Sequence, residues 1–165
     1  MTVRPEQPGD ADAVRALMCA AFGQAAEADI VDRLRERGHD YLALVAVDGG
    51  VVVGQITFSR VTLDPLPSGL RAVGLAPMAV APARQRQGVG SALVRTGLDA
   101  CRAAGHDAVF VLGHPAYYPR FGFAPSAAVR DVYGAPAEAF MTLALTPSAL
   151  DDVAGVAHYD PALAG

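Results

Sequence analysis

The chain has 165 residues, a net charge of −4 and a pI near 5.4. It is long enough for one domain with its own core, and its acidic balance argues against a nucleic-acid-binding face. No apolar run reaches the roughly 18 residues of a membrane span, and the first residues lack the pattern of an export signal, so we expect a cytoplasmic protein that does not associate with membranes.

The first forty residues predict two helices. Asp10 is the expected N-cap of a helix with apolar residues at helical spacing, and Gly23 ends it. A second helix is expected from Glu27 to Arg37, with Gly38 after its last residue.

Three β-strands are expected next. Two apolar, β-branched runs over 41–47 and 51–61 flank Asp48-Gly49-Gly50, which is typical of a hairpin turn. A loop over 62–69 leads to a third strand, 70–80. Pro77 lies inside this strand and has no N–H to donate, which indicates a bulge or a place where strand pairing stops.

The second half predicts one long helix followed by short strands. Cys19 and Cys101 fall at apolar positions of predicted helices, so we expect buried, reduced thiols. A catalytic cysteine is the alternative, but no neighbouring signature supports it. The expected elements are a helix over 88–104, a strand over 108–112, a short helix or turn over 115–121, a strand over 138–145 and an edge segment over 155–163. This order predicts an α/β (α+β) fold with a mixed, mostly antiparallel sheet flanked by helices, in a single domain over 1–165.

The segment from Gln85 to Ser91 connects a strand that ends at Val80 to an amphipathic helix. Glycines allow a ligand to approach the backbone closely, and the N–H groups at a helix N-terminus bind anions such as phosphate. Arg84 and Arg86 add positive charge. The competing interpretation is an ordinary glycine-containing helix start with two solvated arginines.

Two other nucleotide-binding patterns fit this segment poorly. A dinucleotide fingerprint needs a third glycine where Leu93 stands, and a P-loop needs a Gly-Lys pair that the segment lacks.

The residues Gln85 to Gly90 match the form Q/R-x-x-G-x-G/A, and in this the sequence resembles the GNAT superfamily of N-acetyltransferases. Downstream, Tyr117 to Phe123 resembles the family segment in which a tyrosine precedes a Gly-Phe pair. Residues 110–123, together with Ala21-Phe22-Gly23, are similar to the YhbS-like group within that superfamily. The resemblance covers nearly the whole chain.

The resemblance implies acetyl-CoA as the cofactor. It implies a splay between the strands that end near Val80 and Leu112, into which the pantetheine arm would pair with backbone, and Pro77 fits a break in pairing nearby. One backbone N–H close to Val80 would polarise the thioester carbonyl. The implied cofactor-binding residues are Met78, Ala79, Val80, Gln85, Arg86, Gln87, Gly88, Val89, Gly90 and Ser91.

The resemblance also implies direct attack by an amine, which needs an acid and a base. Tyr118 stands at the family's general-acid position, and a phenol is protonated at neutral pH. The competing interpretation of Tyr118 is packing of a helix on the sheet, a role that we expect of Tyr117 instead. Candidate bases are His114, which could instead only hydrogen-bond a loop, and Glu27.

The sequence therefore predicts an N-acetyltransferase that moves an acetyl group to a primary amine of a small molecule or peptide. A non-catalytic acyl-CoA sensor or interaction module and an acyltransferase with another acyl-CoA choice remain alternatives. The four histidines show no metal-ligand spacing, so no metal is expected. Family members often form homodimers, which makes a second copy of the chain a possible partner.

Overall fold

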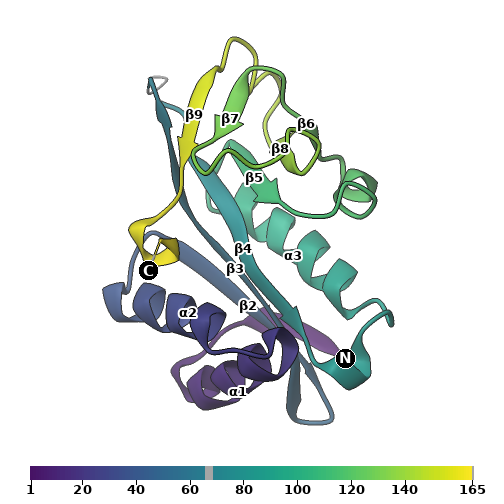
Figure 1. The fold of residues 1–165 in the computed structure, drawn as a ribbon. Coiled ribbons are helices and arrows are strands. Elements are labelled where there is room, and N and C mark those ends of the chain that lie inside the picture. Colours follow the sequence, from purple (N-terminus) through teal and green to yellow (C-terminus); the bar gives the residue numbers. More distant parts are fainter. Residues whose placement is uncertain (66–68, 165) are drawn as a thin grey trace. The chain divides into compact units, whose positions relative to one another are not determined.

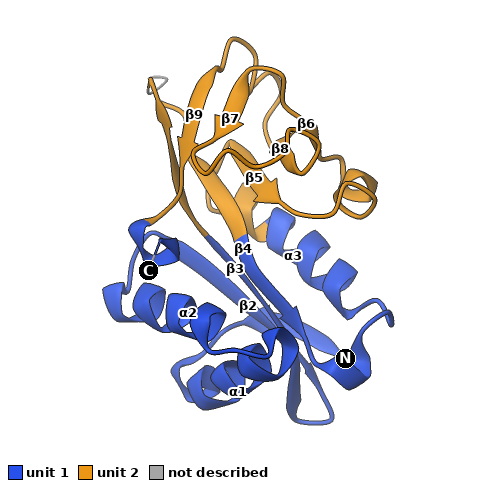
Figure 2. Cartoon of the chain, viewed as in Figure 1, with its two compact units in different colours: residues 1–58, 76–99, 161–165 blue, residues 59–75, 100–160 orange. Residues whose placement is uncertain are grey.

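The computed structural model describes residues 1–65 and 69–164 and divides the chain into two compact units, coloured in Figure 2. Unit 1 comprises Met1–Phe58, Ala76–Asp99 and Pro161–Gly165, and unit 2 comprises Ser59–Leu75 and Ala100–Asp160. Strands β3 (Val51–Asp64) and β4 (Ala72–Val80) and helix α3 (Val89–Ala103) contribute residues to both units. That the chain is one domain stays a prediction. The middle of the loop expected over 62–69 lies outside the described residues.

Unit 1 contains four strands in the order β1, β2, β3, β4, with two helices packed side by side (Figure 1). Strand β1 (Thr2–Pro5) pairs antiparallel with β2 (Tyr41–Asp48). The helices are α1 (Ala11–Phe22) and α2 (Ala26–Arg37). Short 3-10 turns cover Pro8–Asp10, Pro82–Arg84 and Pro161–Leu163.

The ends of both helices follow from glycine. Gly23 and Gly38 have φ of 71° and 70°, and each N–H bonds a carbonyl four residues back. An ordinary side chain resists this left-handed conformation, so the two predicted helix ends are confirmed. Asp10 is the N-cap residue of α1, as predicted, but its side chain makes no capping hydrogen bond to the helix. Its carboxylate accepts a hydrogen bond from Gln7 N at 2.8 Å and pairs with Arg4 at 2.7 Å.

The hairpin between β2 and β3 turns at two glycines, as the sequence predicts. Gly49 and Gly50 have φ of 58° and 79°, the positive values that a two-residue turn of type I′ requires at both central positions.

The two faces of β3 in unit 1 differ in chemistry. A Cβ on Gly54 would come within 2.8 Å of Val89 and Leu93, so this face of the strand lies directly against α3. The opposite face carries the polar side chains of Gln55 and Thr57, both with no exposed surface. Apolar residues of α1, α2 and the sheet fill the rest of the unit's core, namely Val14, Leu17, Met18, Ala28, Val31, Val45 and Ala79.

The strands of unit 2 pair in both directions. The first residues of β4 run parallel to β5 (Ala108–Leu112), and β5 pairs antiparallel with β8 (Phe140–Ala144). Strand β6 (Ala124–Pro125) pairs with the other side of β8. A 3-10 turn covers Tyr118–Phe121.

The C-terminal segment was predicted to lie at the edge of a sheet, and the structure differs from this prediction. Strand β9 (Gly155–His158) pairs antiparallel with β3 on one side and parallel with β7 (Val129–Asp131) on the other. It is therefore an interior strand, and the short β7 takes the outer place. Strands β6 and β7 have two and three residues, too few to leave a periodic signal in the sequence.

Unit 2 is packed around apolar residues of its strands. Phe110 and Phe140 stack with ring centroids 5.9 Å apart. Cys101 is buried as predicted, and burial raises the pKa of its thiol to about 12. Cys19 of unit 1 is only half-buried, which corrects its prediction, and both cysteines are free. The core residues are Val61, Leu63, Ala72, Ala108, Phe110, Val129, Phe140, Val153 and Ala157.

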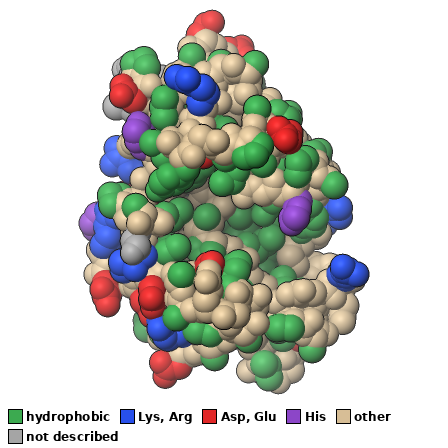
Figure 3. Space-filling model, viewed as in Figure 1, with side chains coloured by type: hydrophobic (Ala, Val, Ile, Leu, Met, Phe, Trp, Pro, Cys, Tyr) green, Lys and Arg blue, Asp and Glu red, His purple; other side chains and the backbone are tan. Residues whose placement is uncertain are grey.

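Within residues 1–65 and 69–164, no helix has both the length and the apolar character to cross a membrane. Acidic and basic side chains are interspersed over the face drawn in Figure 3.

Candidate functional site

A turn and a short loop connect β4 to α3 in unit 1. Ala81 N, just past the end of β4, donates to Val53 O at 2.9 Å and fixes the start of the turn Pro82–Arg84. Helix α3 then begins at Val89. Residues 85–88 therefore link a strand end to a helix N-terminus, as the sequence predicts.

The loop backbone has the geometry of an anion site. Arg86 and Gly88 have φ of 62° and 86°, and turns that contain left-handed residues can direct successive N–H groups toward a bound anion. The first N–H groups of α3 have no partner within the helix by its geometry. A Cβ on Gly88 would meet no atom within 4 Å, so the space beside the loop is open. These features fit a bound phosphate group.

Side chains of the loop bond to its own backbone. Gln85 Nε2 donates to Val80 O at 3.2 Å, and Gln87 Nε2 donates to Ala83 O at 3.1 Å. Each glutamine thus braces the loop against the turn or strand before it. This explains why a glutamine suits the first position of the Q/R-x-x-G-x-G/A pattern in this chain, because Gln85 connects the loop to the end of β4 by a hydrogen bond.

The two arginines beside the loop differ in their surroundings. Arg84 Nη1 lies 2.8 Å from Asp48 of the β2–β3 hairpin, and its Nε donates to Gln87 at 3.3 Å. The hydrogen bond from Arg84 and the nearby N-terminal amine hold the pKa of Asp48 below its usual value. Arg86 is exposed. The sequence suggested equal roles for the two cations, but the charge of Arg84 is already compensated by Asp48.

The end of β4 offers backbone groups to an extended ligand. In unit 1, β4 is the last strand of the order. Its described pairing with β5 covers only Ala72–Gly74 and stops before Pro77, so the predicted break in pairing is present. Among the last three residues, Ala79 is buried in the helix-facing core and Met78 and Val80 are half-buried. A strand edge of this kind can pair with an added extended chain.

Tyr118 lies in unit 2, at the start of the turn Tyr118–Phe121. Its side chain is 8% exposed, packs edge-on against Phe123 and Tyr117, and lies so close to Gly113 that a Cβ there would collide with its ring. Burial, with a smaller contribution from Tyr117, raises the pKa of Tyr118 to about 12. The phenol therefore stays protonated throughout the physiological pH range.

Tyr117 is the less buried of the two tyrosines, which corrects the expectation that it is the packing residue. Its ring is half-buried and carries the Arg120 guanidinium 4.5 Å from its centroid. The deeper ring is that of Tyr118, so Tyr118 packs against its neighbours whatever its chemical role.

The two candidate bases lie in different units. His114 of unit 2 has an exposed side chain, and its carbonyl accepts hydrogen bonds from Tyr117 N at 3.0 Å and Tyr118 N at 3.4 Å. Glu27 of unit 1 is half-buried and accepts hydrogen bonds from Gln24 at 3.0 and 3.2 Å. The structure thus brings together the predicted cofactor residues of β4, the loop and α3, while no described contact joins Glu27 to them.

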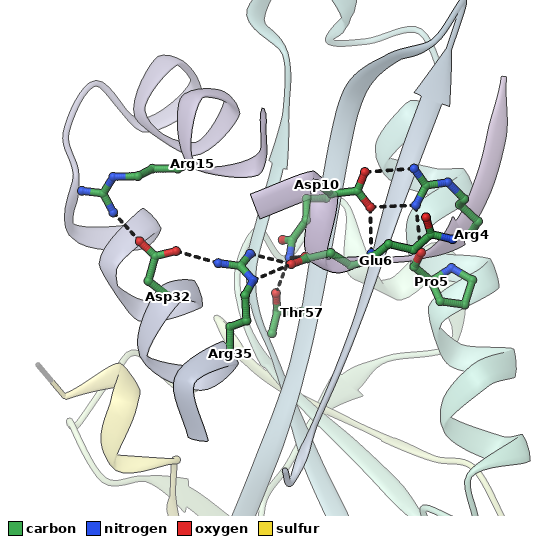
Figure 4. Close-up of polar contacts among 10 residues, drawn as sticks. Arg4, Pro5, Glu6, Asp10, Arg15, Asp32, Arg35 and Thr57 are labelled. Carbon is green, nitrogen blue, oxygen red and sulfur yellow. Dashed lines mark hydrogen bonds and ion pairs between the residues drawn. The ribbon is translucent and has the colours of Figure 1, made fainter. Parts of the chain in front are cut away.

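Sequence reasoning missed a polar network inside unit 1, drawn in Figure 4. Glu6, whose side chain is 7% exposed, accepts hydrogen bonds from Arg35 at 3.0 Å and from Gln55 at 2.9 Å. Gln55 also donates to Thr57 at 2.8 Å, while its Oε1 has no hydrogen-bond partner among the described residues. The signal was a polar residue at alternate positions of an otherwise apolar strand, which is unusual for buried residues.

The described residues contain no group of three or more His, Cys, Asp or Glu side chains that could hold a metal ion.

A mixed sheet with a loop of this kind at a strand–helix junction is typical of α/β proteins that bind a phosphorylated ligand. Residues 2–126 match the model of the acetyltransferase (GNAT) domain. The chain is 40% identical to the uncharacterized N-acetyltransferase YhbS of Escherichia coli (strain K12) over 162 residues, which are 96% of each chain. The chain belongs to the GNAT acetyltransferase family.

Two solved structures of the same family resemble this fold closely. The crystal structure of E. coli YhbS in complex with CoA has a TM-score of 0.93 and 38% identity, covering 99% of this chain and 92% of that one. A GNAT acetyltransferase from Brucella melitensis in complex with acetyl-CoA has a TM-score of 0.81 and 37% identity, covering 98% and 96%. The recognition of the family, the fold class and the acetyltransferase activity predicted from sequence are confirmed.

Proposed function

We propose that the chain transfers an acetyl group from acetyl-CoA to a primary amine of a small molecule or of a peptide end. The observation that carries the proposal is the loop 85–90, whose backbone has the geometry of a phosphate site at the start of α3. Two relatives at 37–38% identity are complexes with CoA or acetyl-CoA, which supports the choice of cofactor.

The proposed cofactor contacts are mostly with backbone. The N–H groups from Arg86 to Ser91 would hold the pyrophosphate. The hydrogen bond from Gln85 to the Val80 carbonyl would hold the loop in place. Backbone groups of Met78, Ala79 and Val80 would pair with the pantetheine arm. Acetyl-CoA, when bound, supplies the acetyl group as a thioester, and a backbone N–H near Val80 would stabilise charge on its carbonyl oxygen.

The transfer forms a C–N bond and breaks the C–S bond. The amine gives up a proton, and the sulfur of the leaving group takes one, so the reaction needs a proton acceptor and a proton donor. We assign the donor role to Tyr118, since its raised pKa keeps the phenol protonated. His114 and Glu27 are the two proposed acceptors.

The direct test of the activity is the release of free CoA thiol from acetyl-CoA in the presence of amino acids, polyamines, aminoglycosides and short peptides. Turnover with at least one amine is expected. Tight CoA binding without turnover across the panel would instead favour an acyl-CoA sensor, and turnover only with longer or charged acyl-CoAs would correct the acyl choice.

The cofactor loop is tested by Gly88→Val, measured as CoA affinity by calorimetry. A side chain there would occupy the space that the pyrophosphate needs, so we expect at least a hundredfold loss. Gly23→Val is the matched control, because Gly23 also has a positive φ, 71°, and open space around its Cβ position. Equal CoA affinity of both variants would place the cradle elsewhere.

The donor role is tested by Tyr118→Phe, which deletes one hydroxyl and keeps the packed ring. We expect kcat to fall by about 10² to 10⁴ with little change in acetyl-CoA affinity. Tyr117→Phe is the control and should stay near the parent rate. Unchanged kcat of Tyr118→Phe between pH 6 and 9 would remove this residue from the mechanism.

We also propose a cytoplasmic location, and a homodimeric state as the family resemblance suggests. Cell fractionation with an antibody to the chain tests the first proposal. Sedimentation velocity at micromolar concentration tests the second.

A further inference from the structure

The loop 85–88 of unit 1 contains one residue in a conformation that its side chain disfavours. Arg86 has φ of 62°, in the left-handed region that residues other than glycine adopt at a cost in free energy. The other non-glycine residues with positive φ in the described ranges are Asp40, Ser148 and Asp152. Their short polar side chains can hydrogen-bond to nearby backbone, which the long arginine side chain is less suited to do. A glycine would fit this turn better, so the arginine needs a reason other than the turn.

The Arg86 side chain takes no part in holding the loop together. Of its two neighbours, Gln85 donates to Val80 O at 3.2 Å. Gln87 donates to Ala83 O at 3.1 Å. Arg86 is exposed, and its guanidinium makes no hydrogen bond or ion pair with any residue that the structure describes. Removing this side chain would therefore leave the bonds of the loop in place.

Arg86 is also the cation of this loop whose charge is not compensated. The neighbouring Arg84 lies 2.8 Å from Asp48, which compensates its charge. The chain as a whole has a net charge of −4, which repels an anionic ligand at long range. A free guanidinium therefore gives the loop a local attraction for a phosphate group that the net charge of the chain opposes.

CoA has a phosphate group for which the loop backbone does not account. In the proposed function, the N–H groups from Arg86 to Ser91 bind the pyrophosphate. The 3′-phosphate is attached to the same ribose as the pyrophosphate, a few covalent bonds away, and a phosphate monoester carries about −1.5 to −2 charges at pH 7. An arginine side chain ends in a planar fork of donors that matches a phosphate group. Arg86 thus has the charge and the length to reach a second phosphate next to the one that its backbone would bind.

We propose that Arg86 binds the 3′-phosphate and makes the site selective for CoA over 3′-dephospho-CoA. The proposal rests on the proposed function, because it concerns a second group of the same cofactor. Arg86 is a specificity-determining residue and not a catalytic one, since the 3′-phosphate lies at the end of CoA that is remote from the thioester. The cost of the left-handed backbone is then offset by a contact that forms only with the bound cofactor.

The experiment is calorimetry on the whole chain with CoA and with 3′-dephospho-CoA, at 0.05 M and 0.5 M salt. The parent should bind CoA at least about fivefold more tightly at low salt, as expected for a charge-assisted contact at an exposed site. This preference should shrink at high salt, because added ions screen the contact. Arg86→Gln should bind both compounds with nearly equal affinity. Arg86→Lys keeps the charge without the fork and should retain part of the preference.

Two further variants separate the contact from general charge and from loop stability. Arg130→Gln is the matched control, because it removes an exposed arginine of unit 2 and changes the net charge equally, and it should keep the preference. Arg86→Gly relieves the backbone, so it should lose the preference and still unfold at the same or a higher urea concentration than the parent. A large loss of stability in Arg86→Gly would overturn the premise that the loop does not need this side chain.

The affinities for the two compounds decide the proposal. Equal binding of both by the parent would overturn it. An equal loss of affinity for both in Arg86→Gln would also overturn it, because the guanidinium would then act on the pyrophosphate. Failure of the proposed function has a different result, since the parent would then bind neither compound.

Discussion

In unit 1 a row of charged and polar groups runs from Arg15 on α1, through Asp32 and Arg35 on α2, to Glu6 after β1 and on to Gln55 on β3 (Figure 4). In unit 2 the contacts that we compare with this row are between aromatic rings. Tyr118 packs edge-on against two rings, Phe110 stacks on Phe140, and Tyr133 stacks on Tyr159.

This difference predicts which changes of sequence or pH should affect the stability of each unit most. Charged groups with partners favour the ionised state, so the pKa of Asp10 is lowered, first by its hydrogen bond from Arg4. Burial favours the neutral state, and it is the largest cause of the raised pKa values of Cys101 and Tyr118. Unit 1 should therefore respond most to removal of charge, and unit 2 to changes of volume and to alkaline pH.

The largest expected effect is the loss of Arg35 from the network. Arg35→Gln would leave the buried carboxylate of Glu6 without its cation. Breaking a buried pair in this way costs about 3–5 kcal/mol, and we expect a loss near the lower end because Arg35 is partly exposed. Urea unfolding measures it. Arg15→Gln is the control, because Arg15 is 42% exposed and its exposed pairs with Asp29 and Asp32 should contribute much less to stability. Equal losses from the two variants would show that burial does not set the difference.

A side chain added at a tightly packed glycine should lower the stability of either unit, but only in unit 2 should it also lower kcat. A Cβ on Gly97 would stand 2.5 Å from the Phe58 ring, and one on Gly113 would collide with the Tyr118 ring. Each substitution by alanine should cost about 1–3 kcal/mol of stability. Only Gly113→Ala should also lower kcat, since it displaces the proposed proton donor.

Gly9→Ala is the matched control for both variants, because a Cβ there meets nothing within 4 Å and its φ is not positive. A fall in kcat of Gly97→Ala as large as that of Gly113→Ala would mean that the loss reflects general instability.

Much of unit 1 could be predicted from the sequence because its signals are local. Gly23, Gly38 and the pair Gly49-Gly50 mark chain reversals that need positive φ, and the structure has them at these positions. The loop 85–90 is likewise a contiguous segment. Its bracing by Gln85 could not be foreseen, since that bond depends on where the backbone of Val80 lies.

Unit 2 and the buried network were less predictable because they depend on contacts distant in sequence. Strand β7 has three residues and exists through its pairing with β9, which lies more than twenty residues later. Glu6 and Gln55 are 49 positions apart, and only the fold brings them together. The same reason explains why Asp10 is the N-cap residue of α1 and yet makes no side-chain capping bond, since its carboxylate pairs with Arg4 instead.

Alkaline pH should weaken the fold through unit 2. The folded-state pKa values of Cys101 and Tyr118 are raised to about 12, above the unfolded values, so their contribution is full below the unfolded pKa and is lost as the pH rises toward 12. The free energy of unfolding should fall between about pH 9 and 12. Tyr118→Phe should reduce that slope between pH 10 and 12 by at most about 1.4 kcal/mol per pH unit.

Tyr117→Phe is the control for the alkaline transition, since Tyr117 is less buried. An unchanged slope in Tyr118→Phe, measured by urea unfolding at each pH, would contradict the assignment of the transition to this buried phenol.

The smallest effect on stability is expected at the exposed pair of Asp48 and Arg84 in unit 1. Asp48→Asn removes the anion that compensates Arg84 beside the loop 85–90, and a pair exposed to this degree contributes little to stability. The same change frees the Arg84 guanidinium to attract an anionic ligand. We therefore expect CoA to bind about two- to fivefold more tightly at low salt, with the gain shrinking at 0.5 M salt because added ions screen exposed charges. Calorimetry at the two salt concentrations measures this difference in CoA affinity.

Weaker CoA binding by Asp48→Asn would contradict this prediction. It would mean that Asp48 holds Arg84 in a position that the ligand needs, so that the carboxylate positions Arg84 and does not compete with the ligand for it.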